Sequence, residues 1–134
     1  MNRERVEELL TSARVRLMEV RYLLESREEI DFAEIGLLCH EAALQAMRAY
    51  LTACGNVPSS TRDLPHLLDE LLEIDITCDP LIEPAVELEE LSRKVGGAAA
   101  AKRALGLAAG FSEFFLVRLR AAGYDPAPPT SEND

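Results

Sequence analysis

The sequence lacks any long apolar run. Its N-terminus reads MNRERVEE, which is too charged to be the apolar core of a secretory signal. Elsewhere no stretch approaches the roughly 18 apolar residues that suggest a membrane-spanning helix. The most apolar segment, residues 96–110, is interrupted by Lys102 and Arg103. We therefore expect a cytoplasmic protein that does not associate with a membrane.

Cysteine is scarce, and its spacing does not suggest a metal site. The three cysteines, Cys39, Cys54 and Cys78, contain no CxxC pair, which is a spacing typical of zinc sites. His40 follows Cys39 directly and would face a different side of a helix. We expect reduced thiols, with at least one in the core because free cysteine buries readily. Neither a metal nor a cofactor is predicted.

Basic residues are scarce in the middle of the chain. The net charge is −10, and residues 56–91 hold ten acidic residues against a single base, Arg62. Strong non-specific binding of nucleic acid needs many phosphate contacts and is typical of basic proteins. The charge argues against that function class. Solvated helix faces are the simplest explanation of the remaining charged clusters.

Alternation with period two and long internal repeats are both missing, whereas helical periodicity is strong. Apolar residues between positions 3 and 26 recur at spacings of 4, 3, 4, 3 and 4, which places one seam along a helix. That seam comprises Val6, Leu10, Ala13, Leu17, Val20 and Leu24. Further helices are expected at residues 32–54, from 64 to between 73 and 76, at 84–95 and at 98–122.

These helices predict an all-α protein, an antiparallel four-helix up-and-down bundle plus a short extra helix. On the last helix we expect a core stripe of Leu107, Phe111, Phe114, Val117 and Ala121. Gly55 and Gly123 are placed to end helices. The bundle is predicted to span residues 1–124, and residues 125–134, DPAPPTSEND, are expected to form a disordered tail.

The alanine-rich second helix and the segment after it carry a family resemblance. The helix reads AALQAMRAYL over residues 42–51, and it is followed by Gly55 and by the helix start Thr61-Arg62-Asp63-Leu64. In these features the chain resembles the HEPN family (higher-eukaryote and prokaryote nucleotide-binding domain). Its members typically show a helix like AAEKALKALL, a glycine and a THDL-like helix start. The order of the helices is also similar.

The resemblance implies a helical interaction module. Such modules form homodimers and often pair with a small nucleotidyltransferase, and some of these pairs act as toxin and antitoxin. A nucleotide is a further ligand that the resemblance implies.

The chain also departs from the family. Leu44 stands where the family often has Glu, and Arg62 replaces the His of THDL. Ribonuclease-type members carry an Arg-x4-6-His motif near the start of the last helix, but neither Arg93 nor Arg103 is followed by such a His. We therefore interpret the chain as a non-nuclease member and assign no catalytic residue. Metal-independent RNA cleavage of the HEPN type is kept as the alternative.

Six residues are candidates for binding a ligand or partner: Arg48, Thr61, Arg62, Asp63, Arg93 and Lys94. Arginine offers a planar fork for phosphate or carboxylate, and a helix start offers free N–H groups that favour an anion. The simpler interpretation makes Thr61 and Asp63 helix caps and places the basic residues in surface ion pairs. For His40 we expect a hydrogen bond at the edge of its helix, and for His66 a solvent-facing position.

Overall fold

The computed structural model describes residues 2–26 and 29–124, so the tail predicted at 125–134 lies outside the described residues. Within them the chain forms five α-helices and no strand, which confirms the all-α prediction. The elements are α1 (Arg3–Glu25), α2 (Phe32–Ala53), α3 (Leu64–Ile74), the 3-10 helix η1 (Ile76–Leu81), α4 (Ile82–Leu91) and α5 (Ala98–Ala121). None of the described helices is long and apolar enough to cross a membrane.

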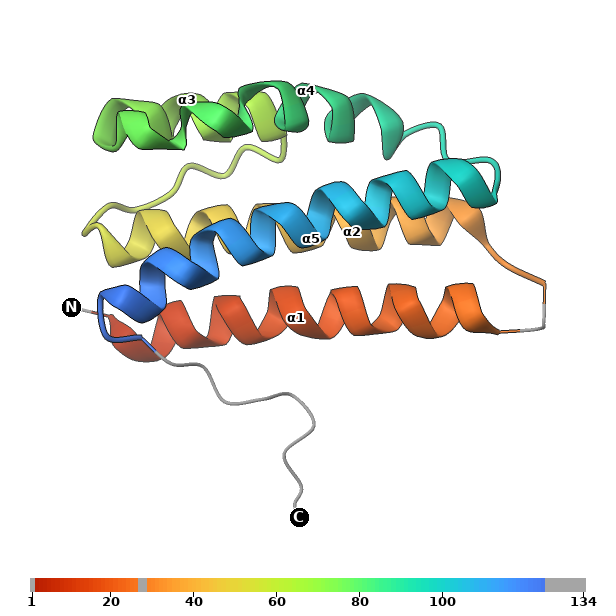
Figure 1. Ribbon diagram of the computed structural model, residues 1–134. Helices are drawn as coiled ribbons and strands as arrows, with labels where there is room; N and C mark the ends of the chain where they lie inside the picture. The colour runs from red at the N-terminus through yellow and green to blue at the C-terminus, as the bar shows by residue number, and fades with distance from the viewer. Residues whose placement is uncertain (1, 27–28, 125–134) are drawn as a thin grey trace, which may run out of the picture.

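The helices are arranged in three layers. Helices α2 and α5 lie side by side, with α1 on one face and the α3–α4 pair on the other (Figure 1). Arg62, before α3, contacts Glu41 near the middle of α2, and Asp75, after α3, contacts Tyr50 farther along α2. Helix α3 therefore runs parallel to α2, and the connection between them crosses back along the bundle. Helices α1, α2, α4 and α5 alternate in direction (Figure 1).

The seam predicted on α1 is confirmed, because five of its six residues are buried and Leu24 is half-buried. It packs on α2, whose alanines Ala42, Ala43, Ala46 and Ala49 are completely buried. Small side chains at these positions let the neighbouring helices approach α2 closely. The alanine-rich helix is thus the centre of the core.

The stripe predicted on α5 is partly wrong. Phe111 is buried as expected, but Val117 is 56% exposed and Ala121 is also exposed. The buried stripe consists instead of Ala101, Ala104, Ala108, Phe111, Ser112, Phe115, Leu116 and Leu119. The ring of Phe115 lies 5.2 Å from that of Tyr50 on α2. Phe115 is therefore buried in the core, and Phe114 packs against the core while half-buried.

Helix ends mostly follow local sequence signals. Gly55 has a φ of 87°, the left-handed conformation that glycine adopts at little cost, which confirms its predicted role after α2. Asp31 caps α2 by accepting a hydrogen bond from the N–H of Glu34. Helix α4, predicted at 84–95, instead spans Ile82–Leu91. A 3-10 helix that contains Pro80 leads into α4. Helix α4 ends at Leu91, several residues before Gly96 and Gly97.

Gly36 permits a close contact between α2 and the segment that follows α4. A Cβ built on Gly36 would lie 2.4 Å from the carbonyl oxygen of Ser92 and 3.2 Å from a methyl group of Val95. Only glycine fits this position without moving the backbone of Ser92. Glycine slightly destabilises a helix. At position 36 it also allows α2 and the segment after α4 to approach each other closely.

Gly36→Ala should destabilise the protein by about 2 kcal/mol, because overpacking against backbone atoms forces a shift in one of the two elements. Chemical denaturation of the variant measures this change. Gly110→Ala is the matched control, because nothing lies within 4 Å of a Cβ at that position in α5. It should instead stabilise the helix by up to roughly 1 kcal/mol. Equal stabilities of the two variants would contradict the close-approach argument.

Candidate functional site

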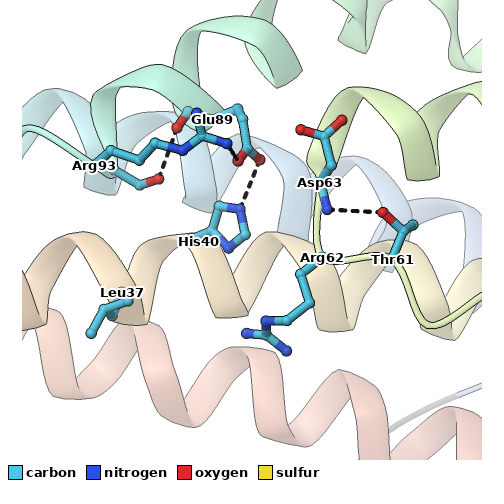
Figure 2. Close-up of a pocket in the computed structure, with 8 residues that line it drawn as sticks. Leu37, His40, Thr61, Arg62, Asp63, Glu89 and Arg93 are labelled. Atoms are coloured by element: carbon cyan, nitrogen blue, oxygen red, sulfur yellow. Dashed lines mark hydrogen bonds and ion pairs between the residues drawn. The ribbon is translucent and has the colours of Figure 1, made fainter.

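The candidate site is built around a buried carboxylate, Glu89 of α4. The residue is 8% exposed, and its Oε1 accepts hydrogen bonds from Nε2 of His40 and from the backbone N–H of Leu64, both at 2.8 Å. Its Oε2 accepts a hydrogen bond from Nη2 of Arg93 at 2.6 Å. Figure 2 shows His40 of α2 pointing toward Glu89, and Arg93, in the turn just after α4, reaching back to the same side chain. One side chain thus links α2, α3 and α4.

Glu89 is charged despite its burial. Burial on its own would raise the pKa of this carboxyl, because it disfavours the charged form. The hydrogen bonds from the N–H of Leu64, from His40 and from Arg93 act in the opposite direction and leave the pKa of Glu89 below its ordinary value. Leu64 is the first residue of α3. The positive end of that helix therefore also favours the carboxylate.

The start of α3 is occupied by side chains of the protein itself. Asp63 accepts a hydrogen bond from the N–H of His66 at 3.0 Å, and Oγ1 of Thr61 accepts one from the N–H of Asp63 at 3.2 Å. Glu89 also accepts a hydrogen bond from the N–H of Leu64. Together these contacts occupy the backbone N–H donors that an external anion would need. Asp63 is therefore the helix cap that the simpler interpretation predicted.

An open hollow of about 470 Å³ lies beside this network. We call it the Glu89 hollow; it is lined by Leu37, His40, Thr61, Arg62, Asp63, Glu89, Ser92 and Arg93. Arg62 reaches from the loop toward α2 (Figure 2), where it pairs with Glu41. Burial on its own would raise the pKa of Glu41, but the pairing with Arg62 and a hydrogen bond from Gln45 lower it overall. Both arginines of the hollow are therefore paired with carboxylates.

The structure brings four of the six candidate residues to this hollow: Thr61, Arg62, Asp63 and Arg93. Arg48 lies elsewhere, where its Nη2 donates to the carbonyl oxygen of Thr61 at 2.7 Å and its side chain lines a separate hollow. Lys94 is exposed and lines neither hollow. His66 is exposed as predicted, and His40 makes the hydrogen bond expected of it.

Glu89 is the residue that sequence reasoning missed. It lies in a run with several exposed or half-buried glutamates, so composition did not distinguish it. One signal was available: Glu89 is four residues after the buried Ala85 and next to Leu88, on the inner face of α4. Arg93, four residues farther on, is on the same face and is therefore a natural partner.

The pairing of His40 with Glu89 limits the chemistry of the Glu89 hollow. A histidine that donates through Nε2 to a carboxylate can accept a proton only at Nδ1. A general base must also reach the proton that it removes. The pairing fixes the ring of His40 and holds α2 against α4. In the described part of the chain, no group of three or more His, Cys, Asp or Glu side chains is placed to hold a metal ion.

Comparison with known proteins adds no further assignment. No family model, curated protein or solved structure matches the chain. The functional conclusions below therefore rest on the geometry of the molecule and on the resemblance described above.

Glu89→Gln should destabilise the protein by about 2 kcal/mol at neutral pH, because an amide cannot accept hydrogen bonds at both positions and carries no charge for Arg93. Since the pKa of Glu89 is lowered in the folded state, its contribution is fully present above the unfolded-state pKa of about 4.3. It is lost as the pH falls through the lower folded-state pKa.

Urea denaturation of wild type and variant across this pH range measures the effect, and the stability difference should narrow in acid. Glu90→Gln, at the exposed neighbouring position, is the control and should change stability little. A Glu89→Gln protein as stable as wild type at neutral pH would show that the hydrogen bonds of Glu89 do not stabilise the fold.

Proposed function

We propose that this chain is a HEPN-like helical interaction module of the non-nuclease type. It forms a homodimer and pairs with a partner protein such as a small nucleotidyltransferase, and a nucleotide is its further ligand. The alternating directions of α1, α2, α4 and α5 support a four-helix up-and-down bundle, with α3 as the short extra helix. This arrangement agrees with the resemblance found at residues 42–68.

The observation that carries this proposal is an apolar patch on α1, made of Val15, Met18 and Tyr22. Tyr22 is 74% exposed, and with Val15 and Met18 it lines an open hollow that Glu34 of α2 borders. Leu37, one turn after Glu34 on α2, is also 69% exposed, but it lines the Glu89 hollow. Apolar side chains gathered on one face of a small domain mark a surface that a partner covers.

A second copy of the chain is a partner that this patch can accept. The commonest homodimers have two-fold symmetry and bring the same patch of both chains together. An aromatic ring at the centre of such a patch is typical of protein interfaces, where aromatic residues and methionine are enriched. Tyr22 and Met18 would then be the anchors of the dimer.

The arginines of the Glu89 hollow are paired with glutamates, which favours protein association over RNA cleavage. RNA cleavage remains the alternative, and one observation favours it, because His40 and two arginines face the same hollow. Arg62 is paired with Glu41, however, and Arg93 with Glu89. Stabilising the charge of a phosphoryl transition state requires cationic groups aimed at it. Paired arginines and a missing Arg-x4-6-His motif therefore make an RNA-cleaving site the weaker hypothesis.

Size-exclusion chromatography with light scattering tests the dimer. Wild type should elute at micromolar concentration with twice the 14.8 kDa mass of the chain. Tyr22→Ser should shift the equilibrium toward monomer, since the anchor of the patch is removed. Val117→Ser, a control on α5 whose parent residue is 56% exposed, should remain dimeric. A wild-type protein that stays monomeric at these concentrations would refute homodimerisation.

A further inference from the structure

A second polar hollow differs in charge from the first. It has a volume of about 340 Å³ and lies where the start of α1, the end of α2 and the following loop meet. We call it the loop hollow; it is lined by Arg5, Leu9, Arg48, Thr52, Pro58, Ser59 and Ser60. Two guanidinium groups and three hydroxyl groups thus face it, and none of these lining residues is acidic. In a chain with a net charge of −10, two arginines with no acidic residue among the lining residues are a local exception, and the nearby carboxylates of Glu8 and Glu70 contact Arg5 and Ser59.

The two arginines of the loop hollow are placed to bind an anion. Arg48 is half-buried and fixed by its 2.7 Å hydrogen bond to the carbonyl oxygen of Thr61, which uses one N–H of the five on its fork. Arg5 is closest to Glu8, at 3.7 Å, and both side chains are more than half exposed. An exposed pair at this distance is weak. Arg5 is thus paired more weakly than Arg62 and Arg93 are in the Glu89 hollow, and the partner of Arg48 is a neutral carbonyl oxygen.

The remaining lining residues define what else a ligand meets. The hydroxyl of Ser59 donates to Glu70, and that of Thr52 donates to the carbonyl oxygen of Arg48 at 2.8 Å. Ser60, which is exposed, therefore offers the hydroxyl most accessible to a ligand. Leu9 and Pro58 add an apolar wall. The hollow thus combines charged donors on one side with a surface for a small organic group on the other.

We propose that the loop hollow binds the phosphate group of a small phosphate monoester, through Arg5, Arg48 and Ser60. The guanidinium forks match the geometry and charge of phosphate oxygens, and the apolar wall contacts the organic part. This site deepens the nucleotide binding proposed above and rests on that proposal, but it is independent of the dimer. It lies on loop and helix residues that belong neither to the apolar patch nor to the Glu89 hollow.

Titration of the 15N-labelled full chain by NMR tests this site, with inorganic phosphate, AMP and adenosine as separate probes at low ionic strength. Phosphate and AMP should give saturable shifts at the amides of Ser59, Ser60 and Thr61, and adenosine should give none. Tighter binding of AMP than of phosphate would show that the organic part is recognised. Equal affinities would limit the ligand to the phosphate group and contradict the monoester assignment.

Variants then identify the groups that bind. Arg5→Gln should weaken AMP binding by about tenfold, the effect of losing one charged hydrogen bond. Arg5 is exposed, so this variant separates binding from folding. Arg48→Gln should weaken binding at least as much, and Arg62→Gln, the control in the Glu89 hollow, should leave it unchanged.

Two outcomes would overturn the assignment. One is the absence of saturable shifts in the loop with either phosphate or AMP. The other is loss of binding in Arg62→Gln together with full binding in Arg5→Gln. A monomeric wild type would refute the dimer without affecting this result, so the two proposals fail separately.

Discussion

The part of the bundle where α2, α3 and α4 meet depends on the hydrogen bonds that the carboxylate of Glu89 accepts. Removing a carboxylate from water is costly unless donors compensate for the loss, and here the compensation comes from His40, Leu64 and Arg93. Gly36 makes the arrangement possible, because it lies one turn before His40 and admits the backbone of Ser92 against α2. A larger residue at position 36 would hold the end of α4, and with it the carboxylate, farther from His40.

This internal pairing changes the functional meaning of the candidate residues. Arg62 and Arg93 resemble phosphate contacts in the sequence, but in the folded chain each is paired with a buried or half-buried glutamate. Arg48, in contrast, holds the loop through a neutral carbonyl oxygen and shares a hollow with Arg5. The two hollows therefore differ in how strongly carboxylates neutralise their arginines. A count of the basic residues cannot reveal this difference, since both hollows contain two arginines.

The fold could be predicted to the extent that it follows from local patterns. The seam on α1, the cap at Asp63 and the left-handed Gly55 each follow from a few neighbouring residues, and each is confirmed. The stripe on α5 was misplaced because apolar residues surround that helix, so packing of Phe115 against Tyr50 decides the orientation. The spacing of Glu89 after Ala85 indicates only its place on the inner face of α4. Its partners His40 and Leu64, and the contact of Gly36 with Ser92, could not be predicted, because they join elements that are distant in the sequence.

Hydrogen exchange at the amide of Leu64 tests the central role of Glu89 most directly. The first N–H of a helix has no partner within the helix, so protection of Leu64 depends on the carboxylate. We predict slow exchange of this amide in wild type and much faster exchange in Glu89→Ala. The amide of Glu34, which Asp31 caps at the start of α2, should change little by comparison. Equally fast exchange of the Leu64 amide in both proteins would contradict the account.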